Sequence, residues 1–252
     1  MMDFESIQNK IEGILGIKSY PVAVFLLGPD TNKSLFSKWR ELKKHRYCQA
    51  LMRARSGEKV ILDRDEISCP AAASVLGVKP LPPALKKGEG LVGFGIVTAP
   101  EIGRVMFEKM PHLEPGSIEA IAFSPLKGSP FSPDIVVIEA EVEKLMWLVL
   151  ADVNLSGGKR RNGNTAVLQA TCVDASVIPY LEKRLNFSFG CYGCREATDL
   201  AFGEAVVGFP SNMLKPLVEV LEYLSARAVR RSRAKIVYRN LIEEDENKKK
   251  EV

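Results

Sequence analysis

The sequence predicts an α/β protein built from two pseudo-symmetric repeats, with mixed β-sheets and flanking helices; an α+β arrangement is the alternative. Short apolar runs that suit buried strands alternate with runs of helical periodicity, which is typical of α/β folds. The pattern G-E-x-h-V-G-F (h, large apolar residue) also occurs twice, at Gly88–Phe94 and at Gly203–Phe209. Two cysteines precede each copy at similar separations. They are Cys48 and Cys69 in the first half and Cys172 and Cys191 in the second.

This duplication predicts how the chain is divided. We expect residues 1–124 to form the first α/β repeat and residues 134–225 the second, joined by the proline-rich stretch Pro125–Pro133. Residues 226–252 are expected to form a C-terminal helix and tail that carry first basic and then acidic residues. The three segments could also form one compact domain.

Composition places the chain among ordinary soluble proteins. Of its 252 residues, 46% are hydrophobic and 26% charged. No apolar run approaches the ~20 residues that span a bilayer, and the N-terminus lacks the pattern of a signal peptide. We therefore expect a cytoplasmic location, without a membrane contact. In that compartment, clustered cysteines bind metal or do redox chemistry more often than they form disulfides.

The elements of the first half follow from local patterns. In chain order we expect a helix over 3–16, a buried strand over 21–27, a helix start at 46–54, an edge strand over 59–62, a helix over 71–76, a strand over 88–97, a helix over 101–110 and a strand over 117–123. Pro70 suits the first position of its helix, where a missing N–H costs nothing. Cys69 then lies at the positive end of the helix dipole, which favours the thiolate that a metal needs.

The second half repeats the alternation of strands and helices. We expect a strand over 134–140, a helix over 142–152, an exposed polar hairpin over 156–164, a helix over 166–180 that carries Cys172, a glycine-ended turn over 186–190, a helical run after the Cys191-x-x-Cys194 motif, a strand over 203–209 and a long helix over 213–230. The cationic, glycine-rich hairpin lacks the spacing of a phosphate-binding loop.

The cysteines are the strongest functional signal in the chain. Four thiolates are the usual ligands of a [4Fe–4S] or [2Fe–2S] cluster and equally of structural zinc. Only one C-x-x-C pair is present, whereas a zinc ribbon normally has two. Ligands scattered singly near helix starts and glycine turns favour an iron–sulfur site, with 4Fe–4S as the preferred form and zinc as the alternative. The preferred ligands are Cys48, Cys69, Cys172 and Cys191; Cys194 either replaces Cys172 or is a spare thiol.

Several of these segments resemble a known family. The stretches Arg46–Ala50, Ser68–Ala73, Leu76–Val78 and Cys191–Arg195 are similar to the domain-of-unknown-function 169 family. That family consists of prokaryotic proteins, many from anaerobes and archaea, and has no settled activity. The resemblance implies that the cysteines act as a unit, but it implies no reaction.

Signatures of other enzymes are few. His45 lies one helical turn from Cys48, so a Cys–His nucleophile pair is conceivable, although the basic run around His45 favours an exposed side chain. Arg53, Arg55 and Arg195 could bind a small anionic substrate or could offset the charge of thiolates.

Three hypotheses therefore stand. The first is an iron–sulfur protein that serves electron transfer or redox activation of a substrate, with an unidentified redox partner. The second is a zinc-stabilised module without catalysis, whose basic C-terminal helix binds a partner. The third is a thiol redox enzyme that uses Cys191 and Cys194, against which the expected turn at Asn186–Gly190 counts. The acidic run Glu243–Glu246 argues against nucleic-acid binding, and an oligomer stays open.

Overall fold

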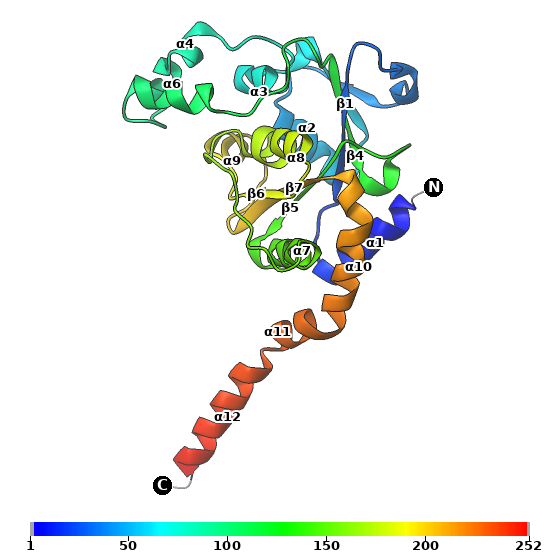
Figure 1. Cartoon of the computed structure of the whole chain (residues 1–252), viewed down its shortest axis with the longest axis vertical. Helices are drawn as coiled ribbons and strands as arrows, with labels where there is room; N and C mark the ends of the chain where they lie inside the picture. Colours follow the sequence, from blue (N-terminus) through cyan, green and yellow to red (C-terminus); the bar gives the residue numbers. More distant parts are fainter. Residues whose placement is uncertain (1–2, 251–252) are drawn as a thin grey trace.

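The computed structural model, which describes residues 3–250, has a seven-stranded mixed sheet with helices on both faces (Figure 1). The strands are β1 (Val22–Leu27), β2 (Arg40–Leu42), β3 (Val60–Asp63), β4 (Ala120–Pro125), β5 (Ile135–Glu141), β6 (Asn186–Ser188) and β7 (Glu204–Pro210). Their order in the sheet is β2-β3-β4-β1-β5-β7-β6. Strands β2 and β3 are parallel and the other neighbours antiparallel. The predicted α/β class is confirmed.

Each face of the sheet carries its own hydrophobic core, because successive side chains of a strand point to opposite faces. Val22 and Val24 of β1 face one core, whereas Ala23 and Phe25 face the other. The first core is covered by α2 (Tyr47–Arg55), α3 (Pro70–Val75), the π-helix η4 (Ala170–Val177), α8 (Ile178–Glu182) and α9 (Tyr192–Ala197). The second is covered by α1 (Phe4–Leu15), α7 (Val142–Leu155) and α10 (Leu214–Leu224). All five cysteines lie on the first face.

A helical arm extends from the first face (Figure 1). It consists of α4 (Pro83–Lys86), α5 (Glu89–Gly93) and α6 (Pro100–Glu108), which contact one another. The strand expected over Gly88–Phe94 is therefore wrong, because this segment is helical. Gly88 has a positive φ of 85°, and a Cβ there would lie 1.9 Å from the carbonyl oxygen of Pro100. Only glycine allows α5 to pack this closely on α6.

The two halves have a similar strand order, read outward from the centre of the sheet. The first contributes β1, β4, β3 and the additional outermost strand β2, the second contributes β5, β7 and β6, and the antiparallel pair β1–β5 joins them. In the first half, β4 therefore occupies the position next to the central strand that β7 occupies in the second half. The expected superposition of Gly88–Phe94 on Gly203–Phe209 is wrong, and the duplication itself stays a prediction.

Two further expectations need correction. Residues 59–62 were expected to form an edge strand, but β2 pairs outside β3, so β3 lies inside the sheet. The turn expected over Asn186–Gly190 contains the short strand β6, which pairs with β7. Short helical turns complete the chain at η1 (Lys33–Phe36), η2 (Arg64–Glu66), η3 (Leu126–Gly128) and η5 (Ser211–Met213).

Two short helical segments follow α10 and still contact the body of the molecule. They are η6 (Ser225–Val229) and α11 (Arg230–Ala234), and they lead into α12 (Ile236–Lys250), which points away from the sheet (Figure 1). Across residues 3–250, the helices are too short or too polar to cross a membrane.

Candidate functional site

Five cysteines from four elements gather on the first face of the sheet. Cys48 lies in the first turn of α2, Cys69 caps α3, Cys172 belongs to η4, and Cys191 and Cys194 begin α9. All five are free thiols, and all but the half-buried Cys69 are buried. The structure therefore brings together every cysteine that the sequence singled out, including the one left as a possible spare.

The closest pair is Cys191 and Cys194, whose sulfurs lie 3.0 Å apart, with Cys191 donating a hydrogen bond to Cys194. Cys191 is also the N-cap of α9, and its Sγ accepts from the backbone N–H of Cys194 at 3.3 Å. This C-x-x-C opens a helix shortly after strand β6. The objection to a thiol redox pair that rested on an expected turn here is therefore wrong.

The other sulfurs are close enough to affect one another's ionisation. Burial raises the pKa of Cys172, and the nearby Cys69, Cys194 and Cys191 raise it further. The hydrogen bond from Cys191 lowers the pKa of Cys194, but the Cys48 thiol and burial outweigh it and raise that pKa to about 12. The pKa of Cys191 is raised by its hydrogen bond to Cys194 and by burial. In this geometry Cys172, Cys191 and Cys194 are therefore protonated thiols at neutral pH.

In this arrangement the cysteine side chains do not form a complete metal-coordination shell. Within residues 3–250, no group of three or more His, Cys, Asp or Glu side chains is placed to hold a metal ion. The donor set is nevertheless chemically suited to one, since thiolates bind zinc, copper(I) and iron–sulfur clusters. Binding would require the hydrogen-bonded thiols to lose their protons and their side chains to turn toward a common centre.

A small cavity of about 180 Å³ opens beside the cluster and is lined by Cys69 and Cys191. Arg46 and Glu196 line it as well, and their side chains form an ion pair at 3.2 Å. The apolar part of the wall comes largely from the helical arm, including Phe94 and Phe107. The half-buried Cys69 is thus placed where a ligand or partner can reach the cluster.

Side-chain hydrogen bonds on the first face also join the two halves of the chain near the cysteine sulfurs. Tyr47 precedes Cys48 on α2, and its hydroxyl is hydrogen-bonded to the hydroxyl of Ser176 in η4 at 2.7 Å. Gln49 donates from its side chain to the carbonyl of Ala197 at 3.2 Å, which ties α2 to the end of α9. These contacts between residues far apart in the chain orient the cysteine-bearing helices.

The arginines that the sequence proposed as anion-binding groups are engaged elsewhere. Arg53 pairs with Glu58 at 3.3 Å, and the buried Arg55 pairs with Glu139 and Asp199. Arg195 donates to the backbone carbonyls of Phe189, Ala201 and Glu204. Arg46, which was noted only as part of a motif, is the arginine at the cavity.

Neither the histidine nor the glycine-rich loop adds to the site. The Nδ1 of His45 is 2.8 Å from the carbonyl of Lys43, in an exposed position. Arg161 of the loop is 2.6 Å from the buried carboxylate of Asp152, a structural contact. The basic character of that loop therefore reflects an ion pair rather than a phosphate site.

Backbone strain marks the segment before η4. Val167 and Gln169 have φ values of 48° and 60°, in the left-handed region that non-glycine residues rarely adopt. The buried Leu168 lies between them, and the eight-residue π-helix η4 begins directly afterwards. Strained residues and π-helical segments cluster at functional sites. The sequence around Leu168 has no glycine or proline that could have signalled this.

Comparison with known proteins identifies the same family as the sequence motifs. The model of the domain-of-unknown-function 169 family, described as uncharacterised ArCR, matches residues 10–220. An uncharacterized protein of Methanocaldococcus jannaschii, MJ0308, is 31% identical over 180 residues, which cover 71% of this chain and 76% of that protein. No solved structure matches the chain.

Proposed function

The chain belongs to the domain-of-unknown-function 169 family, whose description names no activity, and we propose its function from the site: an iron–sulfur protein. We infer that the cysteines bind a cluster, of the 4Fe–4S type, that serves electron transfer or redox activation of a substrate. The observation that carries this proposal is the convergence of five thiols from four separate elements on one largely buried face. Thiols that serve only as small core residues have no need to converge.

The preferred ligands are two from each half, matched by their place in the fold. Cys48 and Cys172 lie on helices, whereas Cys69 caps the α-helix that follows β3 and Cys191 caps the α-helix that follows β6. Cys194 is the alternative fourth ligand. A bound cluster would supply one-electron chemistry, with its potential tuned by burial and by hydrogen bonds to the sulfurs. Zinc could use the same thiolates in a purely structural role.

The partner of the site is proposed from its surroundings. Cys69 and Cys191 both line the cavity, Cys69 is the more exposed of the two, and Arg46 lines it as well. A redox protein or a small anionic substrate that approaches there would meet a guanidinium, which Glu196 already holds in place.

A second function is favoured by one specific observation, the 3.0 Å separation of the Cys191 and Cys194 sulfurs at a helix start. In this function the two thiols reduce a disulfide substrate. One new S–S bond forms between Cys191 and Cys194, the substrate S–S bond breaks, and the two thiol protons pass to the two substrate thiols. The thiol of Cys191 would first have to lose its proton, because its hydrogen bond to Cys194 and its burial raise its pKa.

Metal analysis of protein purified without oxygen tests both functions. We expect iron and acid-labile sulfide in a brown protein. We expect Cys191→Ser to lose most of the iron and to melt earlier, because a lost ligand also removes folding energy. Cys194→Ser is the matched control and should keep most of the iron, because Ala72 stands at the corresponding position of the first half. Metal content and melting temperature of both variants are measured side by side.

Each other outcome has a distinct meaning. Equal loss of iron in both variants would make Cys194 a ligand and overturn the scheme of two ligands per half. Colourless protein with one equivalent of zinc would replace the cluster with the zinc-stabilised module. Metal-free protein that forms a Cys191–Cys194 disulfide on mild oxidation, and in which both variants abolish reduction of a disulfide substrate, would establish the second function.

A further inference from the structure

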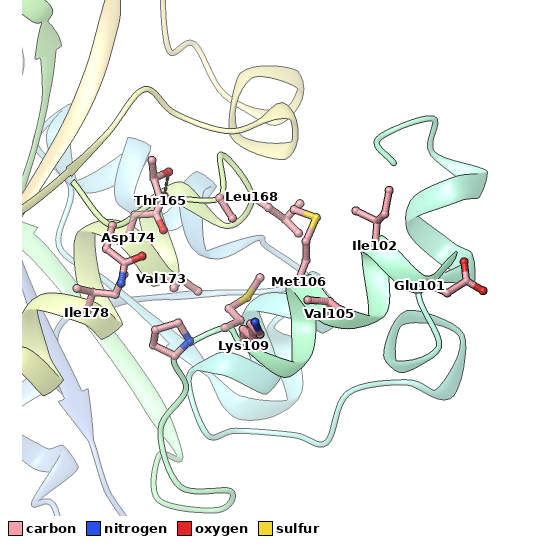
Figure 2. Close-up of a pocket in the computed structure, with 14 residues that line it drawn as sticks. Glu101, Ile102, Val105, Met106, Lys109, Thr165, Leu168, Val173, Asp174 and Ile178 are labelled. Atoms are coloured by element: carbon pink, nitrogen blue, oxygen red, sulfur yellow. Dashed lines mark hydrogen bonds between the residues drawn. The ribbon is translucent and has the colours of Figure 1, made fainter. Parts of the chain in front are cut away.

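A larger cavity, of about 540 Å³, lies between α6 and the segment that leads into η4. Figure 2 shows α6 on one side of it and the loop with Thr165 and Leu168, followed by η4, on the other. Most of its lining is apolar and includes Ile102, Val105 and Met106 from α6 and Val173 and Ile178 from the opposite side. Ile102 and Val105 are 47% and 37% exposed, which is unusual for large apolar side chains that share a hollow.

One buried carboxylate belongs to this largely apolar wall. Asp174 is only 2% exposed and accepts a hydrogen bond from the Thr165 hydroxyl at 2.6 Å. The ion pairs formed within residues 3–250 do not include it, and its side-chain hydrogen bonds are to the hydroxyls of Thr165 and Ser188. A buried carboxylate is normally matched by a cation, because burial of an unpaired charge is costly. A ligand in the cavity can supply that cation.

The cavity adjoins the cysteine site. Leu168 lines both this cavity and the smaller one beside Cys69 and Cys191. It is held there by the strained backbone of Val167 and Gln169. Asp174 follows Cys172 by two residues on η4. A molecule in the larger cavity would therefore lie one side chain away from the sulfurs.

We propose that this cavity binds a small, largely apolar molecule that carries one cationic nitrogen, with the Asp174 carboxylate as its counter-charge. The methionine and branched aliphatic side chains of α6 enclose the apolar part, since methionine adapts to irregular shapes. Lys109 lines the cavity from α6 and disfavours a second positive charge on the molecule. The proposal does not depend on whether the cysteines hold a cluster.

Three indole probes that differ in one group test this site on the full chain. Tryptamine carries an ammonium, tryptophol a hydroxyl and indole-3-propionate a carboxylate, and binding is measured by calorimetry near neutral pH. Tryptamine should bind at least about tenfold more tightly than either analogue, which corresponds to about 1.4 kcal/mol. Asp174→Asn should remove this preference. The matched control Glu101→Gln, which changes an exposed carboxylate of the same cavity, should keep it.

Filling the cavity gives a second, independent variant. Met106→Trp should weaken all three probes by at least about tenfold, because the indole of the new side chain takes their place. Circular dichroism melting shows which variants fold. If Asp174→Asn does not fold, the proposal is tested by the order of the affinities of the three probes for the unaltered chain and by the effect of Met106→Trp on those affinities. Equal affinity for tryptamine and tryptophol, unchanged tryptamine binding in a folded Asp174→Asn protein, or unchanged binding by Met106→Trp would overturn the proposal.

Discussion

A buried ion pair between Arg55 and Glu139 joins the two halves at the level of single residues. The Nε of Arg55 is 2.9 Å from Oε2 of Glu139, although the groups are not aligned for a hydrogen bond. Arg55 ends α2, Glu139 lies in β5, and Asp199 after α9 also contacts the guanidinium. Burial raises the pKa of Glu139 to about 7 even though Arg55 lowers it. The cost of removing the carboxylate from water thus exceeds the attraction.

This raised pKa predicts how stability depends on pH. The pKa of Glu139 is about 7 when folded and 4.5 when unfolded, so the folded state holds the proton more tightly. Its contribution to stability is complete below the unfolded pKa and is lost as the pH rises through the folded pKa. Relative to Glu139→Gln, the unaltered chain should lose roughly 3 kcal/mol of unfolding free energy across that window.

Urea unfolding of both proteins at a series of pH values measures this difference. Glu141→Gln is the control on the same strand, because Lys144 lowers the pKa of the largely exposed Glu141. The control should therefore not reproduce the loss. A difference between the unaltered chain and Glu139→Gln that does not change with pH would show that the pair is ionised throughout.

Part of the residue-level picture could be predicted from sequence. Pro70 marks the start of α3, so the position of Cys69 ahead of a helix was predicted correctly. The second helical run was expected after the Cys191-x-x-Cys194 motif, whereas α9 begins inside it, directly after Cys191. The partner of Arg55 could not be found, because it depends on how β5 lies beside β1 in the sheet. The strained conformations around Leu168 likewise depend on packing and not on local composition.

At the scale of elements, one seven-residue pattern gives two different structures. Gly203–Phe209 forms most of β7, which pairs with β5 over its full length and with β6 on its other side. Gly88–Phe94 folds as α5 in the helical arm. Periodicity alone cannot separate a strand from a helix in an apolar run this short. Neighbouring strands decide the outcome, and the local sequence does not reveal them.

Gly208 in β7 allows the π-helix to lie directly on the sheet. A Cβ at this position would be 1.7 Å from the carbonyl oxygen of Ala175 in η4. Gly208→Ala should therefore push η4 away and cost about 2–3 kcal/mol of unfolding free energy. It should also expose Cys172, which is carried by the displaced helix. Denaturant unfolding and the rate of Cys172 modification by a thiol reagent measure the two effects.

Gly13→Ala is the matched control, since a Cβ at Gly13 in α1 meets no atom within 4 Å. Alanine there should stabilise the protein by up to about 1 kcal/mol and leave Cys172 protected. Similar effects of the two substitutions would mean that η4 does not rest on Gly208.

At the scale of the whole molecule, the two expected repeats share one sheet and one core on each face. Val24 from the first segment and Val137 from the second belong to the same buried cluster, together with Cys48 and Cys172. The expected boundaries at 124 and 134 therefore mark a connection inside this sheet. The sulfur site lies across the two segments, so it forms only when both have folded together. The position of the cysteines on one face agrees with the expectation that they act together. The sequence left open whether the segments form separate repeats or one compact domain, because the pairing of β1 with β5 cannot be read from local patterns.

The C-terminal helix α12 differs from this shared core in how much apolar surface it buries. Val237, Tyr238 and Leu241 of α12 are 75%, 60% and 55% exposed, so they bury little apolar surface. Arg233 of α11, in contrast, donates to the carbonyls of Ile14 and Leu15 at the end of α1, at 3.0 and 2.8 Å. Stability should therefore depend on the chain up to α11 and hardly on α12.

Two truncations test this division. A chain that ends after Lys235 should unfold at the same urea concentration as the full chain, because it keeps the Arg233 contacts and because the side chains of residues 236–244, which it loses, are exposed. A chain that ends after Val229 also loses Arg233, whose charged hydrogen bonds satisfy carbonyls at the end of α1, and should be about 1–2 kcal/mol less stable. Equal destabilisation by both truncations would show that α12 packs on the body and that its exposed face is covered in solution.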